Sequence, residues 1–441
     1  MIFQKISTYS KTDLINILLA FIPISYIAGN LVLNLNVVLI ILLVFSFYGK
    51  SVIKIKFNTA DRLIFLIFLY ICINGIYNNY FNFDFPESPN KNLILEKSSL
   101  YLRYLLFYLS LRFLLINKLI NYKLLFLSLG ACSVFVSIDI IFQYFVGFDL
   151  FGIKADGRRL SGPFGSELIA GSFLQRFWIF SLFSLLLFFH IKNKTIFSLS
   201  VISLLIVISL GIIFSGNRVP LIMFCMMAFL LFFFQKDFRK ILAILLFFVS
   251  IFVTYLFFSS NAYKNHYNEF ILNTEKIVSY LQFKIQGKEV SVLTRYTKEF
   301  ENGFLTWEKN KYFGGGIKAS YWHCSKIKVD YSVVLGGISC NTHPHNYYLE
   351  SLTDLGLTGF LLVLFTFLYI LKNSFALLIG KNNTQVKTLM VPFLIIFLIE
   401  IFPLKTTGSL FTTTNSTFLF FIIAFIISLT DIKKEKKLYD N

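Results

Sequence analysis

The sequence predicts an all-α, polytopic membrane protein with about 12 transmembrane helices and a large, partly helical loop on one side. Apolar runs of about 20 residues recur along the 441-residue chain, and each can cross a bilayer core of about 30 Å. Charged residues make up 15% of the chain, whereas a soluble domain carries roughly 25%. The runs are continuous, which excludes a β-barrel, because barrel strands alternate over segments of about 10 residues.

Twelve apolar segments account for the predicted spans. They are 13–29, 31–48, 61–77, 99–117, 122–146, 168–190, 195–214, 219–235, 239–259, 346–371, 386–403 and 411–430. The first lacks a small-residue cleavage site, so we interpret it as a membrane helix and not as a signal peptide. The chain then divides into helices at 1–259, a large loop at 260–345, further helices at 346–430 and a basic tail at 431–441.

The net charge of +18 comes largely from one alternate set of loops and the C-terminal tail. The other loops are short and mixed in sign, or long and unusual, as at 148–167 and 260–345. The positive-inside rule places the basic set and both termini in the cytoplasm, and the 260–345 loop outside. This rule explains the positive net charge of the chain, and we therefore expect no nucleic-acid partner. The basic set includes Lys50, Lys54, Lys56, Arg62, Arg112, Lys118 and Lys123.

The 260–345 loop predicts two amphipathic helices that pack on the membrane surface or on each other, because long loops are usually functional and apolar residues recur here at helical spacing. Cys324 and Cys340 lie in the same loop. In an oxidising compartment they could form a disulfide, and two free thiols are the alternative. The two apolar stripes are Phe270, Ile271, Thr274, Val278, Leu281 and Ile285, and then Val292, Tyr296, Phe300, Phe304 and Trp307.

Three arginines near the outward face are candidate anion-binding residues. Arg176 lies inside its span, where an unpaired cation is costly, so we expect a functional role, a salt bridge with Glu167 or Glu400, or snorkelling to the interface. Arg218 precedes Pro220 at a helix start, where free N–H groups and the helix dipole favour anions. Arg295 lies one turn before Glu299, so it could bind substrate or form an i,i+4 pair.

Two histidines flank Pro344 at the start of the helix that follows the large loop. His345 is held at a rigid helix end, where a neutral imidazole could accept a proton from a hydroxyl. His343 is interpreted as support for the turn. No HExxH spacing or carboxylate cluster accompanies the pair, so we expect no metal. The GGGIK segment at 314–318 is interpreted as a flexible turn.

The topology and the stretch HPHNYYLESLTDLGLTGF at 343–360 together resemble the O-antigen ligase and O-antigen polymerase superfamily of bacterial envelope proteins. The resemblance covers roughly 60–425. Four other stretches agree with it in order along the chain: RRLSGPFGSELIAGSFL, FSGNRVPL, RYTKEFENGFLTWEKNKYFGGGI and FPLKTTGSLFTTTN.

This resemblance implies a GT-C-like membrane glycosyltransferase in the bacterial inner membrane, active at the periplasmic face without metal or other cofactor. The donor would be a glycan on undecaprenyl diphosphate, transferred with inversion. Ligases use a lipid A core as acceptor, and polymerases use another lipid-linked repeat unit. By motif, Arg218 and Arg295 would hold the diphosphate and His345 would be the essential histidine, while Arg176 matches less closely.

The chemistry of the residues leaves the general base open between His345 and Glu167. Two other classes of function also remain to be compared with the transferase. A lipid-linked glycan transporter would carry charges through the depth of the helix bundle, whereas this chain concentrates them at one face. A purely structural envelope protein would not need the costly Arg176.

Overall fold

The computed structural model describes residues 10–81, 92–154, 159–189, 191–259, 295–324, 343–380, 384–405 and 408–439, and parts of 264–282. Side chains are not described at 256, 259, 295–297, 323–324 and 432–439. The described residues form helices joined by loops and turns, without a named β-strand. The predicted all-α fold class is therefore confirmed.

The helices follow the predicted segments closely. The first ten are α1 (Lys11–Ala20), α2 (Ile22–Ala28), α3 (Asn30–Tyr48), α4 (Thr59–Tyr80), α5 (Asn92–Ile116), α6 (Tyr122–Val146), α7 (Ala170–Phe188), α8 (Lys194–Phe214), α9 (Arg218–Phe234) and α10 (Arg239–Ser259). The large loop contributes α12 (Arg295–Lys309) and α13 (Ala319–Cys324). The last three are α14 (Tyr347–Ile379), α15 (Thr384–Glu400) and α16 (Thr413–Tyr439). Short 3-10 helices are η2 (Gly49–Val52), η3 (Gly162–Phe164) and η4 (Lys236–Phe238).

Membrane-spanning length is met by nine of the described helices, or by ten if the bent pair α1 and α2 forms one span. Helix α9 is apolar but shorter, with 17 residues. Each of the twelve predicted segments contains a helix, yet the count of twelve stays a prediction. On the outside of the bundle, α10 exposes Phe247, Phe248 and Ile251, an apolar surface that suits lipid better than water.

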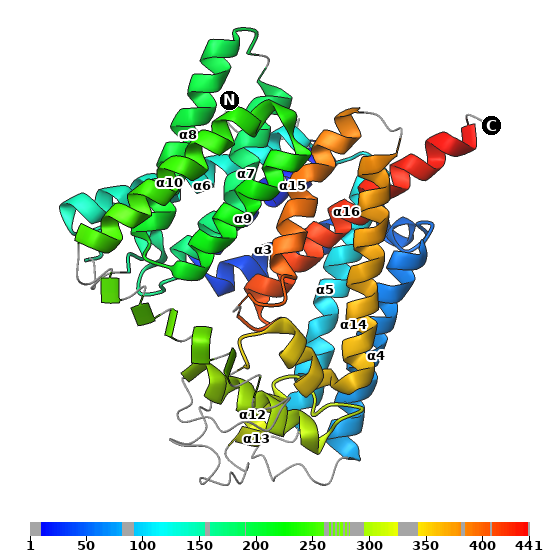
Figure 1. Cartoon of the computed structure of the whole chain (residues 1–441). Helices are drawn as coiled ribbons and strands as arrows, with labels where there is room; N and C mark the ends of the chain where they lie inside the picture. Colours follow the sequence, from blue (N-terminus) through cyan, green and yellow to red (C-terminus); the bar gives the residue numbers. More distant parts are fainter. Residues whose placement is uncertain are drawn as a thin grey trace.

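Helix α16 lies at the centre of the bundle. In Figure 1 it runs between a group that contains α6, α7, α9 and α10 and a group that contains α4, α5 and α14. It packs against α3, α5, α14 and α15. Its residues 418–427 are all apolar and buried, which is typical of a helix that is buried on every face.

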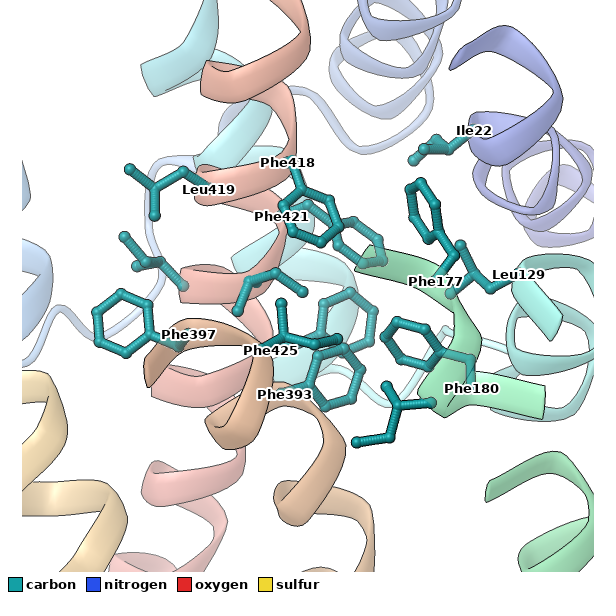
Figure 2. Close-up of a cluster of buried hydrophobic side chains, with 14 of the residues drawn as sticks. Ile22, Leu129, Phe177, Phe180, Phe393, Phe397, Phe418, Leu419, Phe421 and Phe425 are labelled. Atoms are coloured by element: carbon teal, nitrogen blue, oxygen red, sulfur yellow. The ribbon is translucent and has the colours of Figure 1, made fainter. Parts of the chain in front are cut away.

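Aromatic side chains fill the contact between α7, α15 and α16. Figure 2 shows Phe177 and Phe180 of α7 next to Phe393 of α15 and Phe418 and Phe425 of α16. The rings of Phe393 and Phe425 stack with centroids 4.6 Å apart, and those of Phe177 and Phe418 meet edge to face at 5.3 Å. This packing fixes the relative positions of three helices that carry, at one end, the polar residues Arg176, Glu400 and Asn415.

One end of the bundle is closed by a buried ion cluster that corrects the assignment of Arg112 to a cytoplasmic loop. Arg112 is fully buried in the last turns of α5. Its guanidinium donates to both carboxylate oxygens of Asp61 in α4, at 2.8 and 2.9 Å, and to Asp431 in α16 at 2.6 Å. A burial cost of several kcal/mol per ion explains why all three charges are paired. Arg112 therefore joins three helices instead of marking the membrane surface.

The large loop is helical where its second amphipathic helix was predicted. Helix α12 covers Tyr296 to Trp307 of the predicted stripe. It lies with α13 at the end of the bundle opposite to the C-terminal end of α16 (Figure 1). The first predicted helix falls largely outside the described residues, although Ile271 and Val278 are described there as helical and about half exposed.

Candidate functional site

His345 lies at the turn that starts α14, as the sequence predicts. Asn346 caps the helix, because its side-chain oxygen accepts hydrogen bonds from the N–H groups of Tyr348 and Leu349. The Asn346 amide also donates to the carbonyl of Pro403 at 2.7 Å. The Tyr348 hydroxyl donates to the carbonyl of Ile401 at 2.5 Å. The start of α14 is therefore anchored to the segment that follows α15.

The backbone of His345 is strained, because its φ of 53° lies in the left-handed region that side chains with a Cβ rarely adopt. Its imidazole is one-third exposed. The ring of His343 lies against it, with centroids 4.2 Å apart. Such strain is typical of functional sites, where the surrounding structure imposes a conformation that the residue alone would avoid.

A buried carboxylate faces His345 from α12. Oε2 of Glu299 lies 3.9 Å from Nε2 of His345, which is ion-pair distance once the imidazole is protonated. Glu299 is only 3% exposed, so its charge acts on the ring with little screening by water. The sequence paired Glu299 with Arg295 and gave no indication that it faces the histidine.

Helix α12 turns its polar side toward the protein. Glu301, Asn302 and Thr306 are buried, whereas the predicted apolar stripe is only partly covered. A Cβ added at Gly303 would lie 2.7 Å from the side chain of Leu349 in α14, so the two helices are in close contact. The face of α12 that packs against the bundle is thus polar, and this orientation brings Glu299 to the start of α14.

Helix α14 is broken at Gly356, where φ is 67° and ψ is −173°. The GGGIK turn packs into this break. It is therefore a packed element and not the flexible turn that the sequence suggested. Four hydrogen bonds of 2.8–3.1 Å join the turn and the two residues Lys311 and Tyr312 before it to α14: Gly315 N–H to Thr353 O, Gly316 N–H to Asp354 O, Leu357 N–H to Lys311 O, and Thr358 N–H to Tyr312 O.

Polar side chains of α4 and α14 donate to or accept from the backbone groups around the break. Tyr70 donates to the carbonyl of Leu355 at 2.8 Å, Asn74 to that of Phe313, and Asn78 to that of Gly314 at 3.1 Å. Asp354 accepts from the N–H groups of Lys318 and Ala319 at 2.7 and 3.1 Å, at the start of α13. Inside a membrane every freed backbone group needs such a partner. The break is therefore a built feature that separates the first turns of α14 from the rest of the helix.

Replacing Gly314 by Ala is expected to destabilise the protein strongly. The added Cβ would lie 2.3 Å from the backbone N of Gly356, and φ is 78°. Gly147→Ala is the matched control, because φ there is 88° and nothing lies within 4 Å of the new Cβ. We expect Gly314→Ala to cost about 2–3 kcal/mol more than the control, measured by unfolding in detergent. Equal losses would show that the close approach to α14 does not matter.

Arg176 takes part in a second polar cluster at the same end of the bundle. Its Nε and Nη2 donate to both carboxylate oxygens of Glu400 at 3.0 and 3.1 Å, and Nη2 also donates to Asn415 at 2.6 Å. Lys405 donates to the same carboxylate at 2.9 Å. Of the two salt-bridge partners considered for Arg176, Glu400 is therefore confirmed. Glu167 is exposed and lies outside this cluster.

Arg218 is the first residue of α9, so the predicted position at a helix N-terminus is confirmed. Its Nη2 lies 3.3 Å from Oε2 of Glu269, an exposed residue of the large loop. The starts of α7 and α9 touch, because the Asn217 amide donates to the Leu168 carbonyl at 3.4 Å. Glu167, just before α7, therefore lies at the same end of these helices as Arg218.

The structure brings most of the predicted site residues to one end of the bundle. His345 and His343 lie at the start of α14, and Arg295 is the first residue of α12, whose Glu299 faces His345. Arg176 is connected to them through the 400–415 segment that also anchors α14. The side chains of Arg295 and Cys324, and all of Cys340, lie outside the described residues, so the anion contact and the disulfide stay predictions. Among the described residues, no group of three or more His, Cys, Asp or Glu could hold a metal.

One known protein family matches part of this chain. The sequence model of the family described as O-antigen ligase matches residues 202–364, from α8 into α14. The matched part contains Arg218, Arg295, His343 and His345, while Arg176 and the 400–415 segment lie outside it. No curated protein matches the chain. The five stretches, the helical membrane fold and the family match agree, and together they support membership of the O-antigen ligase superfamily.

Proposed function

We propose that this membrane protein is a ligase-like glycosyltransferase. It takes a glycan from undecaprenyl diphosphate and transfers it, with inversion and without a metal, to a lipid A core or a related glycolipid at the periplasmic face. The observation that carries the proposal is the position of His345. Its imidazole is held at a strained, capped helix start within 3.9 Å of the buried carboxylate of Glu299.

The His345–Glu299 pair suits removal of a proton from the acceptor hydroxyl. As the hydroxyl oxygen bonds to the anomeric carbon, the proton passes to the imidazole and the bond from that carbon to the diphosphate breaks. A carboxylate beside the ring stabilises the imidazolium that forms. Glu167 is the alternative base, and its exposure at the start of α7 leaves it free to reach a bound acceptor.

The diphosphate leaving group needs positive charge more than it needs a proton, because it is already acidic. Arg218, at the N-terminus of α9, and Arg295, at the start of α12, are proposed to supply it. The Arg176 cluster adds a net charge of +1, since Arg176 and Lys405 share the single anion Glu400. Cations fixed before the substrate arrives stabilise the developing charge without reorganisation.

A reconstitution assay tests the activity. Purified protein is mixed with a lipid-linked glycan donor and a lipid A core acceptor, and the products are separated by electrophoresis. We expect product with the wild-type chain and a loss of at least about 100-fold in Arg218→Ala. Lys50→Ala, an exposed change in η2 at the other end of the bundle, is the control. Full activity in Arg218→Ala would contradict the assigned diphosphate site.

An O-antigen polymerase is the second candidate, because the family motifs serve both activities. The surface glycan of a deletion strain separates the two. Loss of all polymer from lipid A, with lipid-linked polymer retained, indicates a ligase. A single repeat unit on lipid A indicates a polymerase. A lipid-linked glycan transporter predicts no product in the reconstituted assay.

A further inference from the structure

Two lysines from distant parts of the chain meet at the end of the bundle that carries His345. Lys97 lies in the first turns of α5, and Lys318 ends the GGGIK turn directly before α13. Their ammonium groups are within hydrogen-bonding range of each other, although both can only donate. Both side chains are partly buried, so the two like charges repel with less screening than in water.

The fold holds the two lysines together. Nζ of Lys97 lies 5.2 Å from the centroid of the Trp322 ring in α13, a cation–π contact. A Cβ added at Gly316 would lie 2.6 Å from the side chain of Ile94, so the glycine-rich turn packs directly on the start of α5. The backbone of Lys318 is strained, with a φ of 70°. The close approach of the two cations is therefore imposed by the packing of α5, the turn and α13.

The carboxylates near this pair do not neutralise it. No Asp or Glu of the described residues lies within ion-pair distance of either lysine. The charges of Glu96 and Asp354 act on Lys97 from farther away. Glu96 is exposed to water, and the Asp354 oxygens already accept from the backbone N–H groups of Lys318 and Ala319. The pair therefore keeps a net positive charge.

Helix α13 adds two donors beside the lysines. Oγ of Ser320, in a residue that is 1% exposed, and the indole nitrogen of Trp322 are buried and have no hydrogen-bond partner in the described part of the chain. A phosphate group accepts several hydrogen bonds, and lysine binds it as a point charge. From this arrangement we infer that Lys97 and Lys318 bind a phosphate group of the glycolipid acceptor, an assignment that rests on the proposed function.

The lysine pair and Arg218 belong to different groups of helices. Lys97 lies in α5, beside α4 and α14, whereas Arg218 starts α9, in the group that contains α6, α7 and α10 (Figure 1). Asp354 connects the lysine pair to the part of α14 that follows His345. The donor diphosphate at Arg218 and the acceptor phosphate at the lysines are thus held apart by separate cations, which limits the repulsion between two anionic lipids.

The test measures binding of a fluorescent lipid A core to the full chain in detergent, without donor, so the result does not depend on catalysis. One sample keeps its phosphate groups, and the other is treated with phosphatase. We expect the wild-type chain to bind the phosphorylated form at least about tenfold more tightly, the size typical of charge-assisted hydrogen bonds. The double variant Lys97→Gln, Lys318→Gln should lose this preference, whereas Lys97→Arg should keep it. Lys309→Gln, at an exposed lysine of α12, is the matched control and should bind like wild type.

Three results would overturn the inference. Equal affinity of the wild-type chain for the two forms does so without reference to a variant. A double variant that keeps the preference shows that the lysines only pack. Phosphatidylglycerol that displaces the phosphorylated acceptor at equal concentration shows that the site holds an ordinary membrane lipid.

The transfer assay separates this inference from the proposed function. In that assay the double variant should have a KM for the acceptor at least about tenfold higher than wild type, with the KM for the donor unchanged. A rise in the KM for the donor alone would overturn the assignment to the acceptor. Absence of transfer by the wild-type chain, with phosphate-dependent binding retained, contradicts the proposed function alone and supports the phosphate site.

Discussion

Replacing His345 by Ala is expected to lower the transfer rate at least about 100-fold, the size typical of losing a general base. The imidazole is one-third exposed and lies 3.9 Å from the buried carboxylate of Glu299, so it is accessible to an acceptor and faces an acidic partner. The rate is measured with lipid-linked donor and glycolipid acceptor in detergent. The unfolding curve of each variant is recorded alongside, so that a loss of rate can be separated from a loss of fold.

His345→Gly is the variant that removes the ambiguity of backbone strain. Glycine adopts a φ of 53° without cost, whereas alanine retains the strain. We expect the Gly variant to be at least as stable as the Ala variant and equally inactive. His343→Ala should lose less activity, because we assign its ring, which packs against His345, to support of the turn. Recovery of activity in His345→Gly would show that the turn, and not the imidazole, is what the reaction requires.

Glu299 offers a second check on the same group. Glu299→Gln keeps the size of the side chain and removes the charge that faces the imidazole. If the carboxylate stabilises the imidazolium that forms during transfer, kcat should fall in the variant while the KM for the donor stays the same. An unchanged kcat would show that Glu299 does not assist His345 in the reaction.

The helical architecture was predictable because it follows from local composition. Apolar runs mark helices in a membrane, and Arg218 could be placed at a helix start from Pro220 alone. The pair of Arg176 with Glu400 was among the alternatives because an intramembrane cation needs a partner. These predictions rest on free-energy costs that depend on the segment itself and not on how the rest of the chain folds.

The break in α14 was not predicted, because it depends on contacts between distant segments. Gly356 in an apolar run looks like a helix-packing residue, and the glycine-rich turn looks flexible. Only the fold shows that each supplies the missing hydrogen bonds of the other. One signal was present in α4. Tyr70, Asn74 and Asn78 recur every four residues in an otherwise apolar span, so one helix face had to meet polar groups.

Arg112 was misplaced, and the contact of Glu299 with His345 was not foreseen, for a related reason. Arg112 lies near a predicted helix end, where sequence alone cannot distinguish a surface cation from one buried between Asp61 and Asp431. Glu299 has Arg295 at i−4, and this local pair hid its position opposite His345. In both cases the deciding partner comes from a distant part of the chain.

Glu400→Gln is expected to cost about 3–5 kcal/mol of stability, the largest loss among the substitutions considered, because it leaves two buried cations without their anion. Glu400 is the shared partner of Arg176 and Lys405, and all three are nearly buried. Burial lowers the pKa of Lys405, and Glu400 opposes that shift, so the variant also weakens the protonated form of Lys405. Unfolding by SDS titration in detergent measures the loss, and Glu308→Gln, at an exposed glutamate of α12, is the control.

Arg176→Met should cost far less than Glu400→Gln, since Glu400 keeps Lys405 as its partner and the cluster changes from +1 to neutral. Equal costs for the two variants would contradict the shared-carboxylate arrangement.

The activity of Arg176→Met shows whether Arg176 takes part in the reaction. If its charge helps to hold the diphosphate, Arg176→Met folds but loses transfer activity, and the KM for the donor rises. If Arg176 only joins α7 to α15, the folded variant transfers glycan at the wild-type rate, and the anion site is confined to Arg218 and Arg295.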